Sequence, residues 1–437
     1  MKNKTTRPTP TTGKLSVLAQ LCNLIPGHLV AKLARDHGVD AKARTFTPWS
    51  HVVAMLYAQL THAIGLNDVC DALRHHRGWL SRLRGASPPS KNGFSHANKV
   101  RDAGMAEQLF WKVMDHLQSL QPAFGRGRHR LAHRFRRTIH VVDSTTVQLV
   151  ASCLDWAQHR RRKAAAKCHL RLDLQSLLPR FAIVDTAGHH DNARAREVCA
   201  GIRAGEIVIF DRAYLDFAHL FGLGIRGVFW VTRTKENVRL RVVRRRLLRP
   251  EGRILRDDEV VLMTTHARGE HPGRLRRVTA LVELDGREVE MEFLTNNFTW
   301  AASTVAELYR CRWQIEVFFK QIKQTLQLCD FLGHSANAVR WQVWTALLLY
   351  VLLRFQAFLS AGITASRASS LSSAASSGTA STCSRCCGSM GQHRSLGACA
   401  PSPTKRTSRA SPPILWDSIR SEPAASHSQN RRIMNAP

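Results

Sequence analysis

Apolar positions follow helical spacing in the first third of the chain. Between residues 14 and 135 they recur every three to four residues, interrupted by a Pro- and Gly-containing loop at 88–93. Thr47 followed by Pro48 predicts a helix start, because threonine caps a helix and proline fits its first turn. The pattern predicts an all-helical N-terminal domain, preceded by a loose polar stretch at residues 1–13.

The pattern changes to short apolar runs, typical of strands, at about residue 136. Two buried-type runs end at Asp143 and Asp211, and strand-like runs fill residues 225–297. Helical spacing resumes near residue 301. The expected fold class is α/β over residues 136–360, with a β-rich insertion at about 225–297. The other candidate strands are 170–174, 181–185, 227–232, 239–243, 259–263, 277–282 and 289–294.

Apolar periodicity stops after about residue 360, where Ser, Ala, Thr and Arg dominate. Such a composition buries too little apolar surface to offset the entropy of ordering. We therefore expect residues 361–437 to be either disordered or translated out of frame, and the clustered cysteines at 383–387 favour the second explanation. A shifted reading frame near codon 360 should then restore an apolar pattern.

The chain is strongly basic, with 64 Lys and Arg against 32 Asp and Glu, a net charge of +32. This excess indicates a polyanionic partner. Its spread along the chain favours nucleic acid over an acidic membrane surface. The apolar run at 343–359 contains Arg354 and is short for a membrane span, so we expect a buried helix there.

Two features of the sequence bear on the cellular compartment. The N-terminus lacks the apolar segment of a secretory signal, and the 11 cysteines show no paired zinc spacing. A reduced cytoplasmic protein is the expectation.

Four chemistry-bearing residues share one segment. Arg312, Glu316 and Lys323 lie 3, 7 and 14 residues after Tyr309. At about 100° per residue, the four positions fall within about 60° of one another on a single helix. A carboxylate beside two cations and a phenol suits a site that handles metal-bound phosphate.

Three acidic residues complete the candidate chemistry. Asp143 and Asp211 at strand ends and Glu316 on a helix could converge on paired divalent cations, which activate an attacking oxygen and stabilise a leaving oxygen in phosphoryl transfer. Carboxylates suit Mg²⁺ and Mn²⁺. Taken singly, each has a simpler interpretation: a strand-end Asp is usually a cap or turn former, and Glu316 could pair with Lys320.

The spacing from Tyr309 to Lys323 matches the Y-(2)-R-(3)-E-(6)-K signature, so residues 14–360 resemble the DDE transposases of the fourth insertion-sequence family. Residues 210–214, Phe-Asp-Arg-Ala-Tyr, are similar to its D-R-[GA]-Y element. Segments 229–233, 293–297 and 331–338 also look like family elements. The resemblance implies a ribonuclease-H-like catalytic core with a β-rich insertion, preceded by a helical DNA-binding domain.

The implied activity is metal-dependent cleavage of DNA at insertion-sequence ends and transfer of the 3′-hydroxyl into target DNA. The implied catalytic and metal-binding residues are Asp143, Asp211 and Glu316, with two Mg²⁺ ions that Mn²⁺ replaces. The implied DNA-binding residues are Tyr309, Arg312, Lys323, Arg212 and Lys320. The expected partners are double-stranded DNA, as terminal inverted repeats and target, and a second copy of the chain on that DNA. We expect no membrane and a cytoplasmic, nucleoid-associated location.

Several alternatives stay open. Tyr309 could be an amphipathic core residue, and Arg312 could pair with Glu316 at i+4. The chain could also be a DNA-binding transposase remnant without catalysis, or a plain metal-dependent nuclease. Weaker candidates for metal or DNA contact are Asp185, Asp191, Lys167, His169, Trp230, Trp300 and the Arg-rich run 241–249.

Overall fold

The computed structural model describes residues 14–41, 43–125, 135, 137–149, 153, 157–160, 163–186, 191–247, 252–284, 286–325 and 332–376. The chain divides into two units, Met1–Ala375 and Ser376–Pro437. The first unit contains every described element apart from the last residue of its final helix. The expectations for residues 1–13, and for the tail beyond residue 376, lie outside the described residues.

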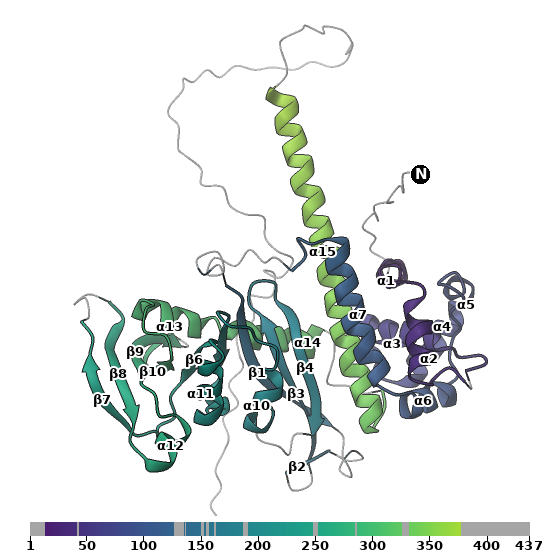
Figure 1. The fold of residues 1–437 in the computed structure, drawn as a ribbon. Helices are drawn as coiled ribbons and strands as arrows, with labels where there is room; N and C mark the ends of the chain where they lie inside the picture. The colour runs from purple at the N-terminus through teal and green to yellow at the C-terminus, as the bar shows by residue number, and fades with distance from the viewer. Residues whose placement is uncertain are drawn as a thin grey trace, which may run out of the picture. The chain divides into compact units, whose positions relative to one another are not determined.

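The N-terminal region is helical, as the sequence predicts (Figure 1). Thr47 caps α3: its Oγ1 accepts the backbone N–H of Ser50 at 3.1 Å, and Pro48 occupies the first turn. Ser90 caps α6 in the same way through Gly93. The helices described in this region are α1 (Lys14–Asn23), α2 (Leu29–Asp36), α3 (Pro48–Thr61), α4 (Leu66–His75), α5 (Arg77–Leu80), α6 (Lys91–Val100) and α7 (Gly104–Leu120).

A ten-stranded sheet follows, in the order β2-β3-β1-β5-β6-β10-β9-β8-β7, with β4 paired to β3. The strands are β1 (Ile139–Leu149), β2 (Gln158–Arg160), β3 (Lys163–Asp173), β4 (Leu178–Thr186), β5 (Ile207–Phe210), β6 (Phe229–Arg233), β7 (Leu240–Arg245), β8 (Ile254–Leu262), β9 (Leu275–Leu284) and β10 (Arg287–Thr295).

The sheet has an antiparallel part, a parallel part and a second antiparallel part. β1, β3 and β4 are antiparallel neighbours, while β5 and β6 continue from β1 in parallel. Every residue of β5 is fully buried, as expected for a central parallel strand. The strands from β10 to β7 are antiparallel again. The segment at about 225–297 thus contains one strand of the parallel part, β6, and the antiparallel strands β7 to β10.

Two connecting helices, α10 (Asp191–Val198) and α11 (Phe217–Ile225), lie on either side of β5 in the sequence. A short 3₁₀ turn, η2 (Arg212–Tyr214), joins β5 to α11, and α12 (Thr265–Glu270) lies between β8 and β9. Thus each parallel connection carries a helix, which is the usual way to join parallel strands.

The single helix expected from Tyr309 to Lys323 is instead two helices, α13 (Ala302–Arg310) and α14 (Trp313–Thr325). Between them, the N–H of Arg312 bonds to the carbonyl of Tyr309 at 2.9 Å, which is the tighter 3₁₀ pattern. The turn lets the two helices follow different surfaces. α13 packs on β6, β9 and β10, whereas α14 packs on β1.

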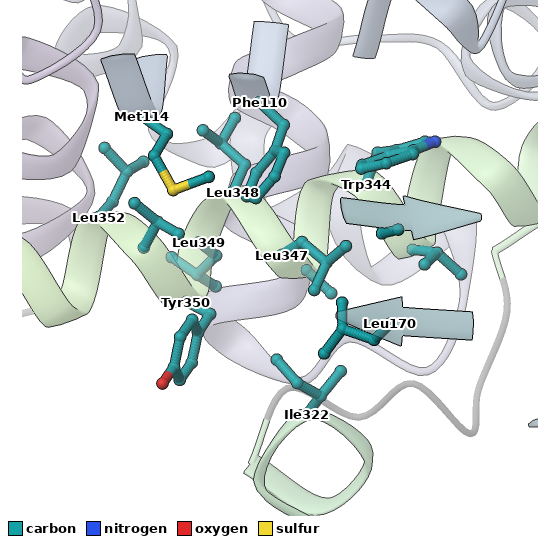
Figure 2. Close-up of a cluster of buried hydrophobic side chains, with 14 of the residues drawn as sticks. Phe110, Met114, Leu170, Ile322, Trp344, Leu347, Leu348, Leu349, Tyr350 and Leu352 are labelled. Carbon is teal, nitrogen blue, oxygen red and sulfur yellow. The ribbon is translucent and has the colours of Figure 1, made fainter. Parts of the chain in front are cut away.

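The last helix, α15 (Ala336–Ser376), joins the helical region to the sheet. Figure 2 shows its side chains between α7, β3 and α14, where the labelled residues are Phe110, Met114, Leu170, Ile322, Trp344, Leu347, Leu348, Leu349, Tyr350 and Leu352. Among the described residues, only the stretch Ala336–Ser360 is long and apolar enough to cross a membrane, and 61% of its most apolar 18-residue window is buried inside the protein. The expected buried helix is therefore present, and it continues past residue 360 to Ser376.

Candidate active site

The parallel pairing of β1 with β5 brings Asp143 and Asp211 together. Val142 and Phe210 are the last paired positions, and the two aspartates follow immediately. Because neighbouring strands lie about 4.8 Å apart, the two backbones are adjacent at this point. The prediction that both strands end here is wrong for β1, which continues to Leu149 because it stays paired with β3, with Asp143 opposite Leu170.

Asp211 also shapes the turn that follows it. Its Oδ2 accepts the N–H of Ala213 at 3.4 Å, which starts η2. The turn buries Tyr214 completely and leaves Arg212 exposed. The capping role expected of a strand-end aspartate is therefore real, and one carboxylate oxygen still lacks a described hydrogen bond to the turn.

Arg312 connects Asp143 with Glu316. Its Nη1 donates to Asp143 Oδ2 at 3.1 Å, and its Nη2 donates to Glu316 Oε1. The Arg312 side chain is 18% exposed, so this contact lies largely out of water. Strand β1 and helix α14 are thus linked through one guanidinium. The expected i+4 pair between Arg312 and Glu316 is present, and the same guanidinium also binds Asp143.

The carboxylates influence one another. Burial raises the pKa of Asp143 to about 7, while Arg312 and the N–H of Ser144 oppose the rise and the negative charges of Asp211 and Glu316 add to it. For Arg312, burial works to lower the pKa, but Tyr309 and the three carboxylates together raise it above its ordinary value. The three acidic groups therefore share one electrostatic environment, with more negative charge than one guanidinium balances.

A divalent cation fits the donor chemistry of this site. Carboxylate oxygens are the ligands that Mg²⁺ and Mn²⁺ prefer. Within the described residues, however, no group of three or more His, Cys, Asp or Glu side chains is arranged to hold a metal ion as it stands. The guanidinium of Arg312 occupies one oxygen of each of two carboxylates, so it competes with an ion for these oxygens.

Tyr309 lies at the edge of the site as a core residue. It is 7% exposed, and its ring packs against Phe293 with 4.8 Å between centroids. Burial raises the pKa of Tyr309 to about 12, and Arg312 lies over the ring at 5.7 Å. The core interpretation of Tyr309 therefore describes this structure better than an exposed phosphate contact.

The two lysines of α14 differ. Lys323 Nζ donates to the carbonyl of Thr146 at 2.7 Å and so ties α14 to β1. Lys320 is exposed, as is Arg212. Besides Arg312, the site therefore has one cation engaged with the sheet, Lys323, and two that face solvent, Lys320 and Arg212.

A polar cluster lies beside Asp143, and it contains three of the weaker sequence candidates, Lys167, His169 and Asp191. Ser144 Oγ donates to Asp191 Oδ1 at 2.6 Å, and Lys167 Nζ lies 3.3 Å from the same oxygen. His169 is hydrogen-bonded to Tyr214 at 3.1 Å, and burial lowers its pKa to about 4. The period-2 spacing of Lys167 and His169 on β3 was the available signal, because it places both on the face where Asp191 lies.

Three of the weaker candidates, Asp185, Trp230 and Trp300, have structural partners. Asp185 is paired with Arg194. Trp230 is fully buried and donates to the carbonyl of Leu220 at 3.0 Å, while Trp300 packs on Phe229. The arginines of β7 are exposed on the last strand of the sheet.

Comparison with known proteins identifies the family. Residues 134–352, half of the chain, match the family model described as Transposase DDE domain. The chain belongs to this family. Residues 13–83 match a second model, a domain of unknown function (DUF4372).

The transposase relatives include elements of the IS4 type. A protein described as transposase y4zB of Sinorhizobium fredii is 34% identical over 52% of this chain and 62% of its own length. The transposase of element IS5377 from Geobacillus stearothermophilus is 28% identical, over 63% and 72%. That of IS4SA from Synechocystis sp. is 22% identical, over 60% and 70%. These matches confirm the resemblance to IS4-type DDE transposases, and the chain spans less than two thirds of the first of these relatives.

Among solved structures, the chain is similar to the cryo-EM structure of the piggyBac transposase synaptic complex with hairpin DNA. It has a TM-score of 0.38 and 8% identity, over 79% of this chain and 76% of that chain. A likeness of this size does not identify the fold.

Proposed function

We propose that this DDE-family chain is a DNA transposase that cleaves DNA at insertion-sequence ends in a metal-dependent reaction and transfers the strand into target DNA. The observation that carries the proposal is the Arg312 guanidinium held between Asp143 and Glu316, with Asp211 on the adjacent strand. These residues lie inside the segment that matches the transposase domain model.

The proposed core is ribonuclease-H-like. Its support is the strand order β4-β3-β1-β5-β6, in which three antiparallel strands are followed by two strands parallel to β1. In this arrangement the two aspartates come from the first and fourth strands of the core and Glu316 comes from a later helix. The antiparallel strands β7 to β10 form the insertion between Asp211 and Glu316.

Asp143, Asp211 and Glu316 are the proposed ligands of two Mg²⁺ ions, which Mn²⁺ can replace. When bound, such ions lower the cost of developing charge on the attacking and leaving oxygens of a phosphoryl transfer. Asp143 contributes a carboxyl that burial keeps partly protonated near neutral pH, so binding a cation there also fixes its ionised form.

Arg312 has two proposed roles. In the structure it neutralises Asp143 and Glu316. With DNA bound, its guanidinium could exchange these carboxylates for phosphate oxygens, which it can hold in a bidentate manner. The exposed Lys320 and Arg212 would contact phosphates nearby, and Lys323 would do so on release from Thr146.

The proposed partners are duplex DNA, as terminal inverted repeats and as target, and a second copy of the chain on that DNA. The net charge of +32 supports association with DNA. Pairing of two element ends is the reason to propose a dimer, and binding to chromosomal DNA is the reason to propose a nucleoid location.

The test is an excision and joining assay. The full chain is incubated with Mg²⁺ or Mn²⁺ and a supercoiled plasmid that carries the DNA flanking its gene on both sides. We expect breaks at the element ends and joined products. Glu316→Gln and Asp143→Asn should abolish both the breaks and the joined products while the chain still binds DNA. Asp115→Asn, on the exposed side of α7, should leave cutting and joining unchanged.

Other outcomes decide against parts of the proposal. Cutting without any joined product would indicate a plain nuclease, and DNA binding without cutting would indicate a remnant that has lost catalysis. Undiminished cutting by Glu316→Gln or Asp143→Asn would remove the residue concerned from the catalytic set.

A further inference from the structure

Helix α6 presents two very different faces. Phe94, Ala97 and Asn98 are buried. The opposite side is exposed at Lys91 and at the positions one, four, five and eight residues after it. These positions form one face of a helix. The polar members of this outward face are Lys91, Asn92, Ser95, His96 and Lys99.

Four of the outward side chains are unpaired among the described residues. Across the part of the chain that the structure describes, Asn92, Ser95, His96 and Lys99 make no side-chain hydrogen bond or ion pair. Their amide, hydroxyl, imidazole and ammonium groups are the kind that pair with base edges, asparagine with adenine and lysine with guanine. The face thus offers several free hydrogen-bonding groups along one line.

The surroundings of α6 carry positive charge. Residues 66–101, from the start of α4 to the residue that follows α6, contain seven Lys and Arg and two Asp, a net charge of +5 (7 − 2). Arg74, Arg77 and Arg82 are exposed among them. Such a charge favours a phosphate backbone as neighbour.

The inner face of α6 is held firmly. The ring of Phe94 packs edge-on against Phe46 and His51, with centroids 5.9 and 5.8 Å away. Asn98 Oδ1 is hydrogen-bonded to His51 Nε2 at 2.8 Å. The outward side chains therefore project from a helix whose rotation is fixed by packing and by a buried hydrogen bond.

A second set of hydrogen bonds joins α6 to the catalytic region. Asn337 Nδ2 donates to the carbonyls of Asn98 and Arg101 at 3.0 and 2.5 Å, and its Oδ1 accepts the N–H of Ala103 at 2.9 Å. Trp341 Nε1 donates to the same carbonyl of Arg101 at 2.7 Å. Both side chains come from the first turns of α15, beside which α6 lies (Figure 1).

The segment that provides Asn337 is the family-like stretch 331–338, which the proposed chemistry leaves without a role. Gly333 within it approaches α15 closely, since an added Cβ would lie 2.6 Å from the Cβ of Ala338. Farther along, α15 packs against Ile322 of α14, the helix that carries Glu316 (Figure 2). A DNA segment placed against α6 would therefore have a defined position relative to the carboxylates.

We propose that α6 is the base-reading helix of this chain, and that its outward face enters the major groove of the duplex at the element end. A major groove about 12 Å wide admits one α-helix. This inference rests on the proposed transposase function and adds to it the element that selects the DNA.

The test compares affinities for two DNA probes. Fluorescent duplexes copied from the DNA flanking the gene are measured against scrambled duplexes of the same base composition, by anisotropy with the full chain. We expect the unaltered chain to prefer the flanking duplexes, and Asn92→Ala with His96→Ala to reduce the ratio of the two affinities by about tenfold or more. Gln108→Ala with Lys112→Ala, an exposed i,i+4 pair on α7, should leave the ratio unchanged although it removes a positive charge.

A second measurement does not depend on any variant. Methylation of guanine N7, which lies in the major groove, should weaken binding of the unaltered chain to the flanking duplex. An unchanged affinity ratio in the α6 variant, or no effect of N7 methylation, overturns the inference. If the unaltered chain cuts and joins DNA but shows no preference for the flanking duplexes, α6 is not a reader and the proposed function stands. If it neither cuts nor joins, the proposed function itself fails.

Discussion

Arg312 donates a hydrogen bond to Asp143 at 3.1 Å, across 169 positions of sequence. The arginine lies at the turn between α13 and α14, and the aspartate lies in the middle of β1. The contact joins the two halves of the proposed site and supplies a positive charge among three carboxylates. Arg312 and a divalent ion are therefore expected to compete for the same negative groups.

The first prediction concerns this competition. Arg312→Gln should lower the free energy of unfolding by about 3 kcal/mol in the presence of a chelator, because it leaves Asp143 and Glu316 without their cation. Adding Mn²⁺ should raise the melting temperature more in this variant than in the unaltered chain, since the ion no longer displaces a guanidinium. Differential scanning calorimetry with and without Mn²⁺ measures both effects.

The matched control for Arg312 is Arg180→Gln. It breaks the pair between Arg180 and Asp173, which joins an arginine to one buried carboxylate at 2.8 Å. Stability should fall, but Mn²⁺ should give no extra gain. An equal response of the two variants to Mn²⁺ would show that the carboxylates near Arg312 do not bind the ion.

The second prediction compares two lysines of α14. Lys323→Met should lower the free energy of unfolding by about 2 kcal/mol, because Lys323 makes a charged hydrogen bond to Thr146. Lys320→Met should cost almost nothing, since Lys320 is exposed. If both lysines reach phosphates when DNA binds, each variant should reduce the dependence of log Kd on log salt by about one. Thermal melts and salt titrations of DNA binding provide the two measurements, and equal losses of stability would contradict the assignment for Lys323.

The sequence predicts the three acidic residues of the proposed site but not their local structure. Asp143 and Asp211 are predictable as candidate metal ligands because an apolar run stops at each of them. The run after Asp143 is polar as far as Thr146, which predicts that β1 ends at Asp143, whereas pairing with β3 continues the strand to Leu149. That pairing depends on a neighbour in space, which the hydrophobic pattern of β1 does not report.

The helix junction shows a similar limit. Spacing alone placed Tyr309 and Glu316 on one helix, and no Gly or Pro marks a break between them. The turn at Cys311 and Arg312 arises because α13 and α14 pack on different strands. Even so, Arg312 still contacts both Tyr309 and Glu316. A short 3₁₀ turn changes the direction of the helix axis but keeps side chains three and four residues apart close together.

The third prediction is a pH dependence centred on His51. Burial lowers the pKa of His51 to about 3, with Asn98 acting in the opposite direction and Arg101 in the same direction. Because the unfolded chain binds this proton at higher pH than the folded one, the stability present above pH 6.5 is lost as the pH falls. His51→Gln keeps a polar partner for Asn98 without a titrating group. When the pH falls from 7 to 5, the free energy of unfolding should decrease by about 2 kcal/mol less in the His51→Gln variant than in the unaltered chain. Chemical denaturation at the two pH values measures this difference.

Other buried histidines also have lowered pKa values, among them His219, whose pKa burial lowers to about 4. His219→Gln therefore serves as the comparison. It should reduce the pH dependence of stability without changing DNA preference. His51→Gln should also weaken the preference for flanking duplexes, because it removes the ring that packs against Phe94 of α6. Identical pH profiles for His51→Gln and the unaltered chain would exclude a buried, neutral His51.

The fourth prediction concerns the connection between α6 and α15. Asn337→Ala removes three hydrogen bonds that hold the end of α6 and the start of α7 against α15. If α6 positions the DNA for the carboxylates, the variant should still prefer the flanking duplexes, but cutting at the element ends should fall at least about tenfold, because a small misplacement of the reacting groups is costly. Asn192→Ala, which removes one hydrogen bond from α10 to Leu215, is the control and should cut at nearly the normal rate. Cutting and binding are measured on the same flanking DNA. A parallel loss of both in Asn337→Ala would mean that the Asn337 contacts support the fold around α6 and do not set its position relative to the active site.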